Sequence, residues 1–268
     1  MILSVDPLQA PGFGLTVVGA LAYLVAALPA PIERRWPAQA LVAAWGVHGL
    51  ALLAGLGLGR YEGLMIGFAP ALSFTVWLVV AVYGIESRLV PVPGVRRVLA
   101  LTAMALMVLA VLFPGEVRAV AHSRWAPLHW VLGLTSYGLF GAAVLHALLL
   151  DAADQRMRDK RAIVSTVYGM PLLKLERMTF RFVEAGFVVL TLALAVGMAS
   201  PNWRWLEHKT VLSLLGWATF AALIIGRVWR GWRGRQATRW LYAGTLLMLL
   251  AYMGSRFVLE VLLHKTPG

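Results

Sequence analysis

Six histidines are the side chains of this sequence whose type could do chemistry: His48, His122, His129, His146, His208 and His264. A neutral imidazole can ligate a metal or carry a proton near neutral pH. Two of the six share an aromatic setting, since His129 precedes Trp130 and His208 follows Trp203 and Trp205. Two imidazoles that converge between aromatic walls can occupy both axial positions of a haem iron. The pattern therefore indicates a candidate haem site, with His129 and His208 as iron ligands.

Cations flank the same residues. Arg204 and Lys209 lie beside the second histidine, and Arg124 lies just before the first. Their side chains could pair with two haem propionates. A simpler explanation competes with this one, because Trp at a membrane interface belongs to the ordinary aromatic belt and a histidine there is often only a hydrated polar residue. Spacing alone favours the simpler explanation.

His48 and His146 form a second candidate site. His146 lies 17 residues after His129 on one expected helix, which is about 25 Å at 1.5 Å per residue, so those two cannot bind one iron. His48 falls near the middle of its expected helix, and His146 falls near the inner end of its own. Together they could form an inner haem or proton site. The alternative is that each histidine makes only hydrogen bonds between helices.

The elements that must position these histidines are apolar helices. The chain has 268 residues, of which 60% are hydrophobic and 13% charged, and its mean hydropathy is +0.77. Soluble domains are nearer half apolar and a quarter charged. The composition therefore indicates an integral membrane protein and excludes a nucleic-acid binder, although the net charge is +12. The absence of Cys excludes disulfides, thiol redox chemistry and Cys-ligated metals.

Apolar stretches set the expected fold. About 20 apolar residues are needed to cross the hydrocarbon core of a bilayer. Eight stretches reach or approach that length, and they predict an all-α, polytopic membrane helix bundle of about eight transmembrane helices. Their approximate bounds are 13–30, 38–58, 64–85, 97–113, 127–150, 180–200, 209–227 and 237–262. The first stretch is expected to be a retained helix and not a signal peptide, because no Lys or Arg precedes Arg34.

Loop charges set the expected orientation. With eight spans, 17 of the 24 Lys and Arg residues fall on one side and 7 on the other. The positive-inside rule places the first side in the cytoplasm and both termini outside. The longest loop, 152–179, is expected to be a basic cytoplasmic loop whose second half forms an interfacial helix. The whole chain, 1–268, is expected to form a single integral membrane domain.

Four stretches carry a resemblance to a known family. They are Pro127 to Ala143, Leu172 to Arg181, His208 to Ala218 and Trp240 to Leu262. The first resembles the His-containing helix of the cytochrome c assembly family, which comprises the CcsA, CcmC and CcmF haem-handling proteins. The other three are similar to one branch of that family, the YpjD-type inner membrane proteins. The motifs are short but occur in order, and the resemblance covers about residues 40–264.

The resemblance implies a multi-pass protein of the bacterial inner (plasma) membrane that binds or moves haem during cytochrome c assembly. The expected cofactor is haem b, and the expected partners are the lipid bilayer and other cytochrome c biogenesis proteins. It is not expected to be an enzyme, since the thiols of any thioether would come from a client. By motif position, His129 matches the first external haem-ligand histidine of the family, and His208 sits where a second ligand could serve.

One departure from the family pattern keeps an alternative open. The haem-handling members carry a Trp-rich external motif that ends in Trp-Asp before Pro-Lys-Glu. Here the loop reads Pro201-Asn-Trp-Arg-Trp-Leu-Glu-His-Lys-Thr, and the Asp is absent. The alternative is a non-haem scaffold or regulatory membrane protein that acts through its basic cytoplasmic loops, 152–181 and 227–239. A small-solute transporter is a weaker third interpretation, because no inverted repeat is visible.

Overall fold

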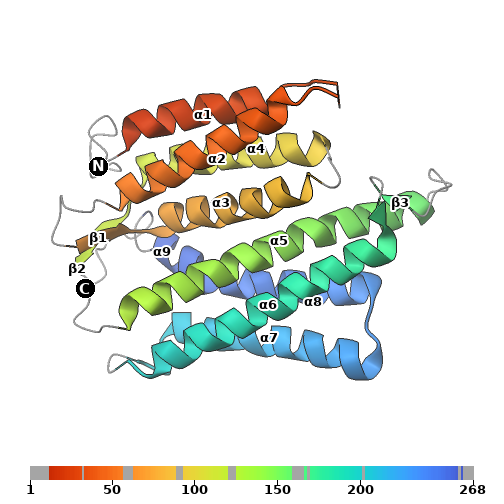
Figure 1. Ribbon diagram of the computed structural model, residues 1–268. Helices are drawn as coiled ribbons and strands as arrows, with labels where there is room; N and C mark the ends of the chain where they lie inside the picture. Colours follow the sequence, from red (N-terminus) through yellow and green to blue (C-terminus); the bar gives the residue numbers. More distant parts are fainter. Residues whose placement is uncertain are drawn as a thin grey trace. The chain divides into compact units, whose positions relative to one another are not determined.

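The structure is a computed structural model that describes residues 12–31, 33–56, 63–88, 93–119, 125–158, 166–167, 170–200, 203–258 and 261. Most of these residues are helical (Figure 1). The chain divides into two compact units, which are Met1–Arg124 with Met253–Gly268, and Trp125–Tyr252. The expected single membrane domain over 1–268 stays a prediction.

The first unit is built from four apolar helices and a small sheet. The helices are α1 (Phe13–Ala27), α2 (Trp36–Gly55), α3 (Phe68–Glu86) and α4 (Pro93–Leu112), and α1 packs on α2 and α4 while α3 packs on α2 and α4. Strands β1 (Gly63–Ile66) and β2 (Glu116–Ala119) pair antiparallel at one end of these helices (Figure 1). Gly115 enters β2 with φ +83°, and a Cβ there would overlap the Ile66 carbonyl. Glycine is therefore required at this turn.

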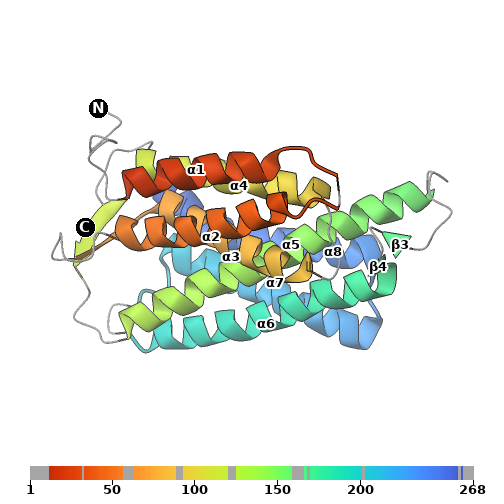
Figure 2. The ribbon, with the colours of Figure 1, turned by 45° about the horizontal axis from the view of Figure 1, so that its top comes forward.

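The second unit consists of four helices that alternate in direction. They are α5 (Ala126–Arg158), α6 (Leu172–Met198), α7 (His208–Arg230) and α8 (Gly234–Leu249). Helix α5 packs along α6 and against α8, and α7 packs on α8 (Figures 1 and 2). Two-residue strands β3 (Thr166–Val167) and β4 (Met170–Pro171) pair between α5 and α6. After α8 the chain continues as a π-helix, Leu250–Gly254, and then α9, Ser255–Phe257, which belongs to the first unit.

The all-α, polytopic membrane bundle predicted from the sequence is confirmed. Each of the eight predicted apolar stretches coincides with one of the helices α1 to α8. Within the described residues, six helices are long and apolar enough to cross a membrane, namely α2 to α7. Helix α1 is shorter at 15 residues, and α8 has 16. The count of eight spans and the outside location of both termini stay predictions.

Both ends of the segment expected to be a loop over 152–179 are helical. Helix α5 continues past its apolar part to Arg158, and an Asp154–Arg158 ion pair at 2.9 Å joins residues one turn apart in the added turns. Such i,i+4 pairs support an exposed helix. The residues expected to form a separate interfacial helix instead begin α6 at Leu172, which runs without a break to Met198.

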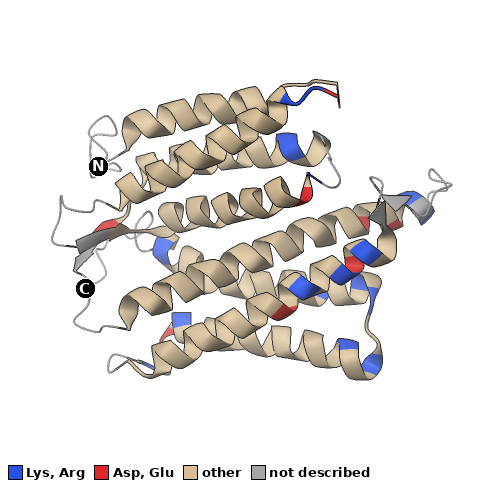
Figure 3. Cartoon of the chain, in the orientation of Figure 1, with Lys and Arg blue, Asp and Glu red and all other residues tan. Residues whose placement is uncertain are grey.

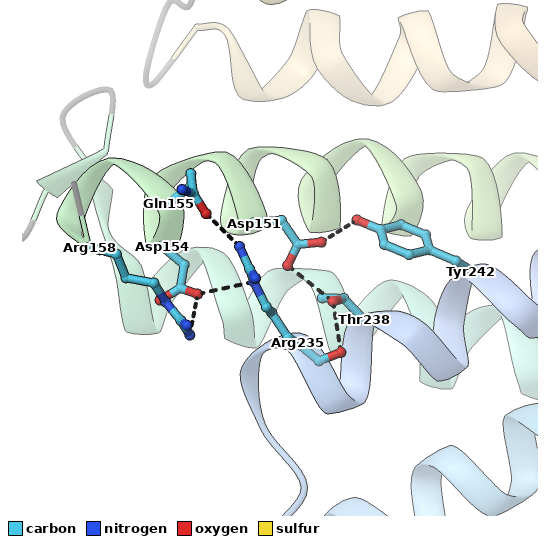
Figure 4. Close-up of polar contacts among 7 residues, drawn as sticks. All are labelled: Asp151, Asp154, Gln155, Arg158, Arg235, Thr238 and Tyr242. Atoms are coloured by element: carbon cyan, nitrogen blue, oxygen red, sulfur yellow. Dashed lines mark hydrogen bonds and ion pairs between the residues drawn. The ribbon is translucent and has the colours of Figure 1, made fainter.

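Charged side chains of the second unit gather at one end of its helices. Lys and Arg are concentrated at the end of α5, the first turns of α6 and the connection between α7 and α8 (Figure 3). At this end Asp151 of α5 accepts hydrogen bonds from the Thr238 hydroxyl at 3.0 Å and the Tyr242 hydroxyl at 2.8 Å (Figure 4). Arg235 lies 3.6 Å from Asp154 and donates to Gln155 at 2.6 Å. These contacts fasten α8 to α5.

Candidate functional site

His129 lies in the first turn of α5 and faces α6. Its ring is half-buried, and its Nδ1 atom lies 2.8 Å from the carbonyl oxygen of Ala193. A carbonyl oxygen only accepts hydrogen bonds, so Nδ1 carries the ring proton. In the neutral ring, Nε2 then holds the lone pair, which is the state in which an imidazole ligates a metal.

Trp203 is brought to His129 by the turn that follows α6. The Ser200 N–H donates to the Gly197 carbonyl at 3.0 Å, and the Trp203 N–H donates to the Ser200 carbonyl at 3.1 Å. A Cβ placed on Gly197 would lie 3.0 Å from Cε1 of His129 and 3.0 Å from Cζ3 of Trp203. The imidazole and the indole therefore meet over the same bare stretch of α6 backbone.

The indole nitrogen of Trp203 is a buried donor. Among the residues that the structure describes, no acceptor lies within hydrogen-bonding distance of Nε1. An unsatisfied buried N–H costs roughly 1–3 kcal/mol, and such groups are rare in folded proteins. The indole atom that lies near Gly197 and His129 is Cζ3, on the ring edge opposite this N–H. An acceptor on a bound ligand would satisfy the N–H.

The other tryptophans named from the sequence are more open to their surroundings. Trp205 packs edge-to-face on Trp203, with ring centroids 5.6 Å apart, and it is 60% exposed. Trp130 is half-buried on α5. Of these aromatic side chains, Trp203 is therefore best placed to form a wall of the site, and Trp205 packs edge-to-face against it.

Glu207 engages the two cations expected at this site. Its carboxylate lies 2.6 Å from Nζ of Lys209 and 3.7 Å from the guanidinium of Arg204. The hydrogen bond from Lys209 and the charges of both cations hold the pKa of Glu207 below its ordinary value. Arg204 and Lys209 are 78% and 62% exposed, so solvent screens these pairs.

His208 is the first residue of α7, and its side chain is exposed. It lies at the same end of the second unit as His129, because α5 and α7 both begin there (Figure 1). No hydrogen bond or ring contact joins the two histidines in the described part of the chain. The structure therefore joins His129 to Trp203 but does not place His208 in contact with His129.

Each member of the second candidate pair has partners within its own unit. His48, in the first unit, is fully buried between Tyr23, whose Oη lies 3.1 Å from Nδ1, and Ser73, whose Oγ lies 2.8 Å from Nε2. His146, in the second unit, is 2% exposed, and its Nδ1 lies 2.7 Å from the Ala142 carbonyl. The remaining two histidines and Arg124 lie outside the described residues.

Three residues of this site were not singled out from the sequence: Ala193, Gly197 and Glu207. Ala193 acts through its backbone carbonyl, which leaves no trace in a side-chain pattern. Gly197 could have been noticed, because it is a glycine near the end of a long apolar helix. Its φ is not positive, so the backbone conformation does not explain the glycine. Glu207 lies within the quoted Trp-rich loop, between the two cations that it pairs with.

These features fit one axial face of a haem. His129 offers Nε2, Gly197 leaves room at the ring, and Trp203 offers an apolar face and a buried donor. No group of three or more His, Cys, Asp or Glu side chains converges among the described residues. A porphyrin supplies four nitrogen ligands of its own, so a haem iron needs only axial ligands from the protein.

Comparison with known proteins connects this chain to a family. The chain is 32% identical over 166 residues to the inner membrane protein YpjD of Escherichia coli K12, a match that covers 60% of this chain and 62% of YpjD. It is 23% identical over 226 residues to the cytochrome c biogenesis protein CcsA of Prochlorococcus marinus SARG, covering 70% and 71%. CcsA of Microcystis aeruginosa is 24% identical over 245 residues, covering 69% and 73%.

The chain thus matches less than two thirds of the length of YpjD. No solved structure matches the chain significantly. The membrane-spanning helices and the likeness to YpjD agree that this is a multi-pass inner membrane protein. The family model described as cytochrome C assembly protein matches residues 65–263, which include α5, α6 and α7. The chain belongs to the cytochrome c assembly protein family.

Proposed function

We propose that this protein binds haem where His129, Gly197 and Trp203 meet, and that it serves cytochrome c biogenesis through this site. Membership of the family and likeness to CcsA support the role in biogenesis. The observation that carries the haem site is the 2.8 Å contact between His129 Nδ1 and the Ala193 carbonyl. It fixes Nε2 as the atom available to iron.

Each residue has a defined role in this proposal. His129 would hold the haem iron through Nε2. Trp203 would form an apolar wall, and its Nε1–H would donate to an acceptor on the ligand. His208 would offer a second imidazole nitrogen to the iron from the exposed start of α7. Arg204 and Lys209 pair with the propionates, and both also pair with Glu207. Trp130 and Trp205 extend the aromatic wall.

The chemistry of this chain favours a haem carrier over an enzyme. Bound haem supplies an iron whose redox potential depends on its axial ligands and burial. Because the chain has no Cys, it cannot itself attach the haem by thioether bonds. The cofactor that we propose is haem b, held without a covalent link. Any thiols that react with the haem vinyl groups belong to a client.

Absorption spectra of the detergent-purified protein test the proposal. The wild-type chain, as isolated or after haem addition, should show a Soret band and the reduced spectrum of a six-coordinate, bis-histidine haem. His129→Ala should lose most of the bound haem, whereas His208→Ala should leave five-coordinate haem. His146→Ala, in the same helix as His129, is the control and should keep the wild-type spectrum. Pyridine haemochrome analysis should identify haem b.

A wild-type protein that cannot be loaded with haem would contradict the proposal. It would favour the alternative, a scaffold that acts through the basic end of the second unit. Arg230 and Arg233 are exposed there, where α7 connects to α8, and they are available to an acidic partner. In that case, reversing the charge of both arginines should abolish capture of the partner. Replacing both by Lys, which keeps the positive charge, should preserve it.

A further inference from the structure

Ala193 and Gly197 lie one turn apart on α6, and both face His129. Ala193 is 3% exposed and Gly197 is also buried. Residues four apart on a helix lie on one face, so the carbonyl of the first and the missing side chain of the second act on the same imidazole. This pairing raises the question of what the two residues do together.

The Ala193 carbonyl sets the proton of the ring. Its oxygen lies 2.8 Å from Nδ1 of His129 and can accept that N–H. A carbonyl oxygen has two lone pairs, so it can accept this bond while remaining part of the helix. Ligand histidines commonly donate their second N–H to a backbone carbonyl, which fixes both the tautomer and the ring orientation.

Gly197 sets the place of the ring. A Cβ at this position would lie 3.0 Å from Cε1 and 3.2 Å from Nδ1 of His129. Both distances are shorter than ordinary van der Waals contact, so any side chain would push the ring away from α6. The same Cβ would lie 3.0 Å from the Trp203 indole. Both rings would therefore have to shift to make room for it.

The backbone does not require glycine here. Gly197 is not among the glycines with positive φ, and it lies within α6. Glycine inside a helix costs roughly 1 kcal/mol relative to Ala. The contact with His129 and Trp203 therefore accounts for the glycine better than helix geometry does.

We propose that Gly197 and the Ala193 carbonyl are the positioning groups of the His129 ligand. They hold the Nδ1–Cε1 edge of its ring against α6 with the proton on Nδ1, so that Nε2 is presented to the haem iron. The inference rests on the proposed haem site, and it adds the residues that aim the ligand. Neither group touches the haem itself.

A pair of glycine variants tests the positioning role. Gly197→Ala adds one methyl group against His129. Gly186→Ala is the matched control, because it lies on the same helix and its Cβ would approach Phe140 at 2.9 Å instead. Gly197→Ala should weaken haem binding about tenfold, which corresponds to about 1.4 kcal/mol, and should convert part of the spectrum to five-coordinate haem. Gly186→Ala should keep the wild-type dissociation constant and spectrum, with at most a lower melting temperature.

The result can separate the two proposals. A wild-type chain that binds no haem contradicts the proposed function itself. A wild-type chain that binds haem while Gly197→Ala matches it in affinity and spectrum overturns only the positioning role. Equal weakening by both variants also overturns it, because general packing of α5 on α6 would then be the cause.

Nuclear magnetic resonance of the haem-free wild type gives a second readout, which does not depend on haem binding. Histidine labelled with ¹⁵N distinguishes the two neutral tautomers. His129, assigned by comparison with His129→Gln, should show the proton on Nδ1. A proton on Nε2 would overturn the inference, since the Ala193 carbonyl would then not be an acceptor for Nδ1–H.

Discussion

The Nε2 atom of His48 lies 2.8 Å from the hydroxyl oxygen of Ser73. The other ring nitrogen of His48 lies 3.1 Å from the Tyr23 hydroxyl, so both nitrogens are engaged. A neutral imidazole has one donor and one acceptor, and two hydroxyls can satisfy both. The three residues join α1, α2 and α3 through a closed, buried network. A metal at His48 would have to displace one of these bonds.

We therefore expect His48→Ala to destabilise the first unit without removing haem from the His129 site. The change would leave two buried hydroxyls without a partner, at roughly 1–3 kcal/mol for each group. Thermal unfolding in detergent should show a melting temperature lowered by several degrees. Thr75→Ala is the control, because its hydroxyl bonds only to Ala71 in its own helix. A loss of half the bound haem in His48→Ala would instead establish a second haem site.

The sequence predicted the helices well because their signal is local. An apolar run long enough to cross a bilayer is visible residue by residue, and all eight runs became helices. His129 and Trp203 were both named for one haem site, but the sequence placed Trp203 beside His208 and did not predict its proximity to His129. The Ala193 carbonyl was not predictable, because it depends on how α5 and α6 are set against each other. The extension of α5 to Arg158 was missed because polar contacts, and not apolar length, support those turns.

Asp151 should stabilise the second unit and have no part in haem binding. Asp151→Ala would remove the acceptor of Tyr242 and the nearer acceptor of the buried Thr238 hydroxyl, which would keep a 3.4 Å contact with the Arg235 carbonyl. Hydrogen bonds to a charged group contribute about 1.5–3 kcal/mol each, so a clear fall in melting temperature is expected. Haem affinity should not change, because 22 residues of α5 separate Asp151 from His129, or about 33 Å. Asp151→Asn, which keeps one acceptor oxygen, should lose less stability.

Acid should release the loop that Glu207 organises. Its pKa is lowered, chiefly by the hydrogen bond from Lys209, so the folded loop favours the carboxylate. A lowered pKa contributes stability that is present above the ordinary value of 4.5 and is lost as the pH falls through the lowered pKa. Fluorescence of the tryptophans in a pH titration below 4.5 should show a transition that Glu207→Gln lacks. An unchanged titration in that variant would show that Glu207 does not control the loop.

Loss of the buried indole N–H of Trp203 should have opposite consequences for the haem-free and the haem-bound protein. Trp203→Phe keeps an aromatic ring but removes the donor that has no partner among the described residues. In the haem-free protein, removal of this donor also removes a desolvation cost of roughly 1–3 kcal/mol. This gain offsets the packing lost with the smaller ring, so the melting temperature should hold or rise. With haem, the lost donor should weaken binding about tenfold. The control Trp229→Phe, at a ring that is 83% exposed near the C-terminal end of α7, should change neither quantity strongly. If Trp203→Phe instead lowered the melting temperature and left haem affinity unchanged, Trp203 would be a packing residue and the ligand would not accept from its indole.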